Sequence, residues 1–162
     1  MSMIRSAVMA ALTLAPTVAG AQALQERNMS LAAAQAIAQG AVEACAAKGF
    51  NVAAVVVDRA GVVRVMLRAD RAGPHTPEAA RAKAYTAASL RNATAAVAEA
   101  VEKNPMQRNL GQIPGFLLLG GGVPARAGDE VIGAVGVGGA PTGQQDDECA
   151  RAGLEKVQLS SN

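Results

Sequence analysis

The sequence predicts an α+β domain in which an antiparallel sheet of about five strands is flanked by α-helices. Two observations support this class. Valine-rich stretches are joined by short glycine-containing turns, which is typical of hairpins. Alanine-rich segments with apolar residues at helical spacing lie before, between and after these hairpins. Hairpins that alternate with helices in this order favour an α+β arrangement over a parallel sheet.

The first half of the chain contains a helix, a hairpin and a second helix. The first helix is expected to begin after a cap at Ser30 and to run to about Lys48, before Gly49. The stretches "NVAAVVVD" (51–58) and "VVRVMLR" (62–68) form the hairpin, with Gly61 in its turn. Thr76 is expected to cap the next helix, because proline and glutamate follow it at positions that suit a helix N-terminus. The apolar face of the first helix comprises Leu31, Ala34, Ala38, Ala41, Val42 and Cys45.

The second half supplies the remaining elements. A short helix is expected from about Thr94 to Lys103, followed by a loop over 104–115. The apolar run "FLLLGGG" (116–122) predicts a buried strand that ends in three glycines, and "VPAR" (123–126) and "VIGAVGVGG" (131–139) predict a second hairpin. The last helix opens near Thr142 with acidic residues in its first turn, as the helix dipole favours. Its helical pattern turns Asp146 toward the apolar side.

The N-terminal stretch resembles a secretory leader. Residues 1–23, "MSMIRSAVMAALTLAPTVAGAQA", combine one basic residue with an apolar run and end in a small-x-small site. We therefore expect cleavage after Ala23, a single domain over 24–162, and a periplasmic or secreted protein. No second long apolar run follows, so no membrane span is expected after cleavage.

Composition excludes several function classes. The formal net charge is only +2 and aromatic residues are almost absent, which argues against nucleic-acid binding. The chain has a single histidine, His75, and no G-x-S-x-G motif, so no hydrolase triad is visible. Zinc requires three or four ligands, which one histidine and two cysteines on helix faces do not supply. No catalytic constellation is visible, and whether the protein is an enzyme stays open.

The two cysteines, Cys45 and Cys149, fall on the apolar faces of the first and last helices. Export permits a disulfide between them, and two buried free thiols are the alternative. A core with many small residues, no tryptophan, one tyrosine and two phenylalanines also favours additional burial in a homo-oligomer.

Three segments carry a family resemblance. They are "VVVDRAGVVRVMLRAD" (55–70), "EAARAKAYTA" (78–87) and "GGGVPARAGDEVIGAVGVGGAPTGQQDDECARAGL" (120–154). In this order they resemble the GlcG/HbpS-like haem-binding family, which includes the C-terminal domain of PduO-type proteins. The resemblance spans about Met29 to Val157. It implies a profilin-like α/β sandwich, homo-oligomers, and haem or iron binding in several members.

The candidate ligand-binding residues lie around the helix that starts at Thr76. The imidazole of His75 is a suitable axial ligand for haem iron, and helix initiation does not require a histidine at this position. Tyr85 and Met106 are the alternative axial ligands. The basic cluster around the same loop is expected to receive carboxylates, with the helix N-terminus contributing backbone N–H groups. The cluster comprises Arg64, Arg68, Arg71, Arg81 and Lys83.

Two further features bear on this site. Lys83 falls on a different helix side from Arg81, which favours a role inside a site or a subunit contact. Gly121 and Gly122 end the expected strand at 116–122 and leave room for a ligand near the backbone.

Three functions therefore remain open. The first is an exported haem- or iron-binding accessory protein with haem as cofactor and His75 as the metal ligand. The second is a small-organic-acid binding protein or enzyme that uses the same basic corner. The third is an oligomeric scaffold or partner of an exported oxidoreductase.

Overall fold

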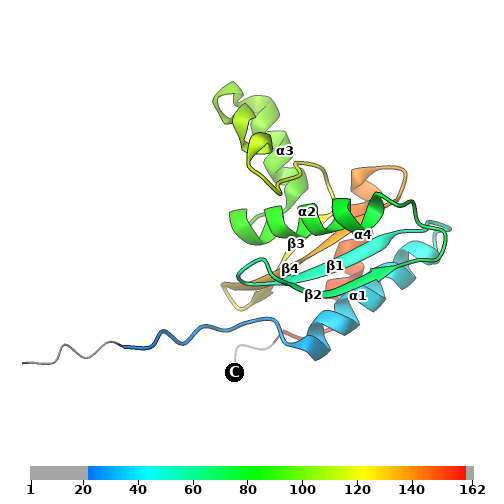
Figure 1. Cartoon of the computed structure of the whole chain (residues 1–162), viewed down its shortest axis with the longest axis horizontal. Helices are drawn as coiled ribbons and strands as arrows, with labels where there is room; N and C mark the ends of the chain where they lie inside the picture. Colours follow the sequence, from blue (N-terminus) through cyan, green and yellow to red (C-terminus); the bar gives the residue numbers. More distant parts are fainter. Residues whose placement is uncertain (1–21, 160–162) are drawn as a thin grey trace, which may run out of the picture.

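The computed structural model describes residues 22–159. The leader expected over residues 1–23 lies outside the described residues, apart from its last two. The remaining chain forms one antiparallel sheet with helices on both faces, and the predicted α+β class is confirmed (Figure 1).

The sheet has four strands. They are β1 (Ala53–Asp58), β2 (Val63–Arg68), β3 (Gly122–Ala127) and β4 (Glu130–Gly138). Their order across the sheet is β2-β1-β4-β3, and all neighbours are antiparallel. Each of the two expected hairpins is present, and β1 and β4 lie side by side at the centre of the sheet.

The helices form two layers around this sheet. The helices α1 (Leu31–Ala46) and α4 (Gly143–Leu154) pack side by side against one face, and α2 (Thr76–Leu90) crosses the other. The helix α3 (Thr94–Lys103) projects away from the body beyond α2 (Figure 1). Residues of β1 alternate between the two layers: Ala54 and Val56 face α1 and α4, whereas Val55 and Val57 face α2.

Glycines in β4 allow α2 to lie directly on the sheet. A Cβ atom at Gly136 would stand 2.0 Å from the carbonyl oxygen of Ala80 and 2.6 Å from the backbone nitrogen of Ala84. No side chain fits in that space. The alanines along α2 and the glycines of β4 therefore provide a contact between two backbones, which explains how a chain with few large residues still forms a close-packed layer.

The strand expected over 116–122 is not formed, apart from Gly122, which opens β3, so the sheet has four strands where about five were expected. The segment is irregular, and its backbone groups bond to threonine side chains in place of a neighbouring strand. The N–H of Leu117 donates to the hydroxyl of Thr86 at 2.9 Å, and the carbonyl of Leu119 accepts from the hydroxyl of Thr94 at 2.7 Å. An apolar run alone does not distinguish a strand from a segment whose backbone is satisfied by side chains.

Three local expectations also differ from the structure. Part of the loop expected over 104–115 is the 3-10 helix η1 (Pro105–Gln112). Leu31, placed on the apolar face of the first helix, is 51% exposed because it lies at the helix end. Thr76 is the first residue of α2 and its hydroxyl donates to the carbonyl of Gly73, so His75 occupies the cap position without a side-chain capping bond.

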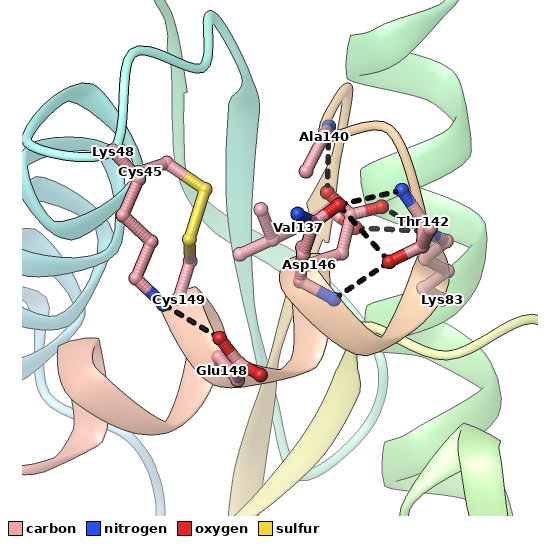
Figure 2. The surroundings of a disulfide bond; sticks show 10 residues. Cys45, Lys48, Lys83, Val137, Ala140, Thr142, Asp146, Glu148 and Cys149 are labelled. Carbon is pink, nitrogen blue, oxygen red and sulfur yellow. Dashed lines mark hydrogen bonds and ion pairs between the residues drawn. A yellow bond between two sulfur atoms is a disulfide. The ribbon is translucent and has the colours of Figure 1, made fainter.

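The helices α1 and α4 are joined covalently. Cys45 and Cys149 form a disulfide with their Cα atoms 5.5 Å apart, and both residues are fully buried (Figure 2). The sequence left a disulfide and two free thiols as alternatives, and the packing of the two helices decides for the disulfide. Close by, Lys48, in the turn after α1, forms an exposed ion pair with Glu148 of α4.

Candidate functional site

A cavity of about 490 Å³ opens where the start of α2, the end of β4 and the start of α4 meet. Small residues dominate its wall, and its polar side chains come from both helices. The lining residues are Gly73, His75, Thr76, Ala79, Lys83, Leu119, Gly138, Gly139, Ala140, Pro141, Thr142, Gly143 and Asp146.

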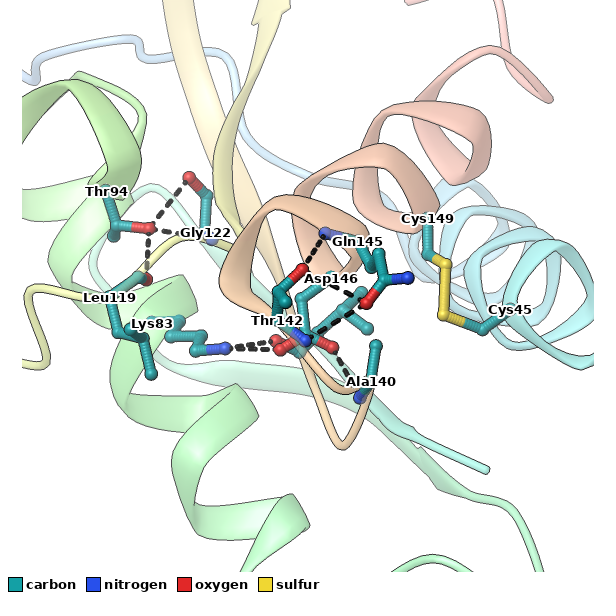
Figure 3. A network of polar contacts seen from close by, with 11 residues as sticks. Cys45, Lys83, Thr94, Leu119, Gly122, Ala140, Thr142, Gln145, Asp146 and Cys149 are labelled. Carbon is teal, nitrogen blue, oxygen red and sulfur yellow. Dashed lines mark hydrogen bonds and ion pairs between the residues drawn. A yellow bond between two sulfur atoms is a disulfide. The ribbon is translucent and has the colours of Figure 1, made fainter. Parts of the chain in front are cut away.

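A buried ion pair forms the floor of this cavity. The ammonium of Lys83, on α2, lies 2.7 Å from a carboxylate oxygen of Asp146, on α4, and their side chains are only 2% and 4% exposed. The same ammonium donates to the carbonyl of Val137 at 2.9 Å (Figure 2). The other carboxylate oxygen of Asp146 accepts from the backbone N–H of Ala140 at 2.9 Å. The pair therefore connects α2, β4 and α4 at one point (Figure 3).

Burial changes the acidity of this carboxyl group. Removal from water raises the pKa of Asp146 above its ordinary value, because desolvation disfavours the charged form. The hydrogen bond and charge of Lys83 and the backbone N–H groups of Ala140 and Gly139 act in the opposite direction and offset only part of this effect. Asp146 is thus a carboxylate whose charge depends on its lysine partner.

The N-terminus of α4 forms one wall. The hydroxyl of Thr142 accepts from the backbone N–H of Gln145, and the Gln145 side chain accepts from the backbone N–H of Thr142. This capping box fixes the start of the helix beside the ion pair (Figure 3). A helix N-terminus carries partial positive charge, so this wall favours an anionic group.

His75 lies at the mouth of the cavity. Its side chain is exposed and makes no hydrogen bond within residues 22–159. The ring packs on Gly73, where a Cβ atom would stand 2.9 Å from the imidazole Cε1. The glycine therefore leaves space for the ring.

The structure brings His75 and Lys83 together and places the other candidates elsewhere. Gly121 is buried behind the floor with a φ of 117°, and a Cβ atom there would stand 3.1 Å from the Lys83 Nζ. Gly122 donates its N–H to the hydroxyl of Thr94. Neither glycine lines the cavity.

Three further candidates also lie outside the cavity. Arg71 is exposed on the loop that precedes α2. Arg81 pairs with Glu78 on the outer side of α2 at 2.6 Å. Tyr85 packs edge-on against Phe116, with ring centroids 5.9 Å apart. Of the basic cluster, only Lys83 reaches the cavity, because it is the member on the side of α2 that faces the sheet.

Sequence reasoning did not place Asp146 and Thr142 in the candidate site. Both residues were explained by their place at the start of the last helix, Thr142 as its first residue and Asp146 as an acidic residue in its first turn. The signal that connects them was nevertheless present, because Lys83 and Asp146 are opposite charges on helix sides that otherwise carry small or apolar residues. Buried charges of this kind are usually paired.

Among the described residues, no group of three or more His, Cys, Asp and Glu side chains is arranged to hold a metal ion. Within residues 22–159, no helix combines the length and apolar character that crossing a bilayer requires.

Comparison with known proteins identifies the family. The family model described as "Haem degrading protein HbpS-like" matches residues 29–155. A Citrobacter freundii protein, described as an uncharacterised 15.0 kDa protein of the dhaT-dhaS intergenic region, is 38% identical over 136 residues, which cover 81% of this chain and 93% of that protein.

Solved structures agree with this match. A double mutant of Streptomyces reticuli HbpS has a TM-score of 0.81 and 39% identity, with 90% of this chain and 99% of that chain covered. Klebsiella pneumoniae ORFY has a TM-score of 0.79 and 29% identity, with 86% and 97% covered. A PduOC–haem complex, at 22% identity over 83% and 99% of the two chains, shares the fold with a TM-score of 0.73. The chain belongs to the HbpS-like haem-degrading family.

Proposed function

We propose that this protein binds haem in the cavity between α2 and α4, with His75 as an axial ligand of the iron. Lys83 and the N-terminus of α4 would receive carboxylate groups of the same molecule. The family description concerns haem, and PduOC, which shares this fold, was solved with haem bound.

One observation carries the proposal: the single histidine of the chain and a buried lysine line the same cavity. Of the three N–H groups of the Lys83 ammonium, one donates to Val137 and one to Asp146. The third has no hydrogen-bond acceptor among the described residues. An axial base at the mouth and a hydrogen-bond donor at the floor match the two kinds of polar contact that haem makes.

The size and lining of the cavity are also compatible with a flat ligand. Glycines and Ala79 line much of the wall, so few side chains obstruct the space. Leu119, which is 50% exposed, and Pro141 supply apolar contact surface at the edge. When bound, haem would supply redox and oxygen chemistry at its iron, and the protein residues would bind, orient and partly shield it.

Export to the periplasm or beyond is part of this proposal. The leader-like pattern of residues 1–23 supports it, and the Cys45–Cys149 disulfide suits an oxidising compartment.

A small carboxylate is the second candidate ligand. The observation that favours it is the polar floor, where Lys83, Asp146 and Thr142 converge, because a small organic acid needs no extended apolar wall. It would use the free Lys83 donor and the start of α4 without iron.

Haemin titration followed by visible absorption tests the first proposal. We expect a saturable Soret shift near one equivalent. His75→Ala removes the axial nitrogen and should weaken binding by about tenfold or more, a loss of about 1.4 kcal/mol. Arg71→Ala, on the same loop but outside the cavity, is the matched control and should bind as the wild type does.

Two comparisons sharpen this experiment. Haemin dimethyl ester lacks free carboxylates and should bind more weakly if Lys83 receives a propionate. A Soret shift unaffected by His75→Ala but lost in Tyr85→Phe would transfer the axial role to Tyr85. No saturable shift would rule out haem, and calorimetry with citrate and succinate would then test the second candidate.

A further inference from the structure

A second cluster of charged side chains lies at the end of the sheet opposite to the cavity between α2 and α4. The end of α2, the β1–β2 turn and the β3–β4 turn come together there, at the left end of the sheet in Figure 1. They form a pocket of about 490 Å³, which we call the arginine corner. Its lining residues are Arg59, Arg91, Arg126, Asp129, Glu130 and Val131.

Only one of the three arginines of this corner is neutralised. Arg59 pairs with Glu130 and, at 3.2 Å, with Glu26. Arg91 and Arg126 form no ion pair with a carboxylate of residues 22–159. Two positive charges therefore line one pocket without an acidic partner of their own, and an anion bound between them would relieve their repulsion.

The guanidinium group of Arg126 is held in place by backbone carbonyls. It donates to the carbonyl of Arg91 at 2.9 Å and to that of Asp129 at 3.3 Å. A guanidinium group has five N–H donors, so these bonds leave others for a ligand. A bulge between Ala125 and Arg126 shifts the register of β3 against β4, and bulges change the direction in which a side chain points. Arg126 is thus fixed while its charge stays unmatched.

The backbone of Arg91 is unusual for an arginine. The residue ends α2 with a φ of 53° and a ψ of 28°, and every other described residue with a positive φ is a glycine. This left-handed conformation is unfavourable for a residue with a Cβ atom, and glycine or asparagine usually occupies it after a helix. Because an arginine costs stability there, its exposed side chain points to a role in binding.

A phosphate group is the ligand that suits this arrangement. The two oxygens of a carboxylate are matched by one guanidinium fork, whereas a phosphate group presents more oxygens and can be held by two forks at once. The carboxylate of Asp129 accepts no hydrogen bond from the described residues, since only its backbone carbonyl is used. It can accept one from a hydroxyl group of the ligand.

We propose that the arginine corner binds a phosphate group, either as the free ion or as a monoester of a small molecule, through Arg91 and Arg126. The pair of Arg59 and Glu130 forms a fixed wall beside it. The corner uses the end of α2 and the start of β4, whereas the cavity proposed for haem uses the start of α2 and the end of β4. The proposal therefore does not rest on the proposed function.

Isothermal titration calorimetry with inorganic phosphate in a low-salt buffer tests the site. We expect saturable binding near one equivalent that weakens as sodium chloride is added, because salt screens exposed charges. Arg126→Gln should weaken binding by about tenfold or more, since it removes charge-assisted hydrogen bonds. Arg64→Gln removes an exposed arginine of β2, outside the corner, and is the matched control that should bind as the wild type does.

Arg91→Gly separates binding from folding. Glycine adopts a positive φ without a steric penalty, so this variant should melt at or above the temperature of the wild type. It should nevertheless bind phosphate about tenfold more weakly, because the guanidinium group is lost. Reduced affinity in a variant that is not destabilised cannot result from unfolding. Arg126→Lys keeps the charge without the fork and should recover only part of the affinity lost in Arg126→Gln.

Titrations with glycerol 3-phosphate and succinate identify the class of ligand. A monoester that binds as tightly as inorganic phosphate would assign the corner to phosphorylated small molecules, and a weaker monoester would assign it to the free ion. Four results would overturn the proposal. They are no saturable phosphate binding, tighter binding of succinate than of phosphate, phosphate binding that survives both Arg91→Gly and Arg126→Gln, and an equal loss in Arg64→Gln.

Discussion

Lys83 and Asp146 are opposite charges held inside a domain whose core consists mainly of alanine and valine. Burial of each charge costs several kcal/mol, and the ion pair and its backbone partners repay this only when all contacts are made. Lys83 bonds to β4 and Asp146 bonds to the turn before α4, so the pair is tied to the fold while one N–H of Lys83 has no acceptor among the described residues. The same pair forms the floor of the candidate site, so the stability of the domain and the geometry of the site depend on the same contacts.

Removal of one member should be far more damaging than removal of both. Asp146→Ala leaves an unpaired buried ammonium and should lower the free energy of unfolding by about 3–5 kcal/mol. The double variant Lys83→Met, Asp146→Leu removes both charges and should be more stable than Lys83→Met or Asp146→Leu alone. Urea denaturation measures all of these variants.

An exposed ion pair on α3 is the control for this cycle. Lys103 pairs with Glu99, and the two side chains are 74% and 63% exposed. Lys103→Ala should therefore destabilise the protein far less than Asp146→Ala does. Additive effects of the two single changes at Lys83 and Asp146 would contradict a coupled pair.

At the scale of elements, the packing of α2 on the sheet depends on residues without side chains. Gly136 and Gly138 of β4 lie under the first turns of α2, where Ala80 and Ala84 present only methyl groups. This close approach brings Lys83 near enough to bond to Val137. The geometry of the cavity therefore depends on how closely helix and strand approach.

Gly136→Ala should separate the two elements. Its new methyl group would stand 2.0 Å from the carbonyl oxygen of Ala80, so the helix must move. We expect a loss of about 1–3 kcal/mol in the free energy of unfolding, measured by urea denaturation, because overpacking forces backbone shifts. Gly111→Ala is the control, since its methyl group would meet Leu118 at an ordinary 3.7 Å. Equal stability of the two variants would show that the α2–β4 contact is adaptable.

At the scale of the whole molecule, the two layers are stabilised in different ways. The α2 layer packs by close contact between backbones, whereas the α1–α4 layer is closed by the Cys45–Cys149 disulfide. The two cysteines are 104 residues apart, so the cross-link joins the first helix to the last. It encloses all four strands within one covalent loop.

Loss of this cross-link should destabilise the whole domain. The double variant Cys45→Ala, Cys149→Ala should lose about 2–5 kcal/mol, mainly because the unfolded chain gains freedom. Thermal and urea denaturation with and without reductant measure the effect. Reductant should destabilise the wild type and leave the variant unchanged, and a variant as stable as the oxidised wild type would contradict this role.

Local sequence patterns determined many of the helices and turns of this protein. The Ser30 cap, the β1–β2 hairpin, the bounds of α3 and the start of α4 near Thr142 follow from residue types whose preferences act over a few positions. The single histidine, the motifs of the family and the apolar positions of both cysteines were also visible in the sequence.

Only the tertiary structure decided the rest, because these outcomes depend on contacts between residues far apart in the chain. The run at 116–120 is irregular because threonines of α2 and α3 satisfy its backbone. Arg81 and Lys83 lie two positions apart, yet one faces solvent and the other pairs with Asp146, 63 positions later. Neighbours on a helix point in different directions, and only the packing of α2 on the sheet determines which of them enters the cavity.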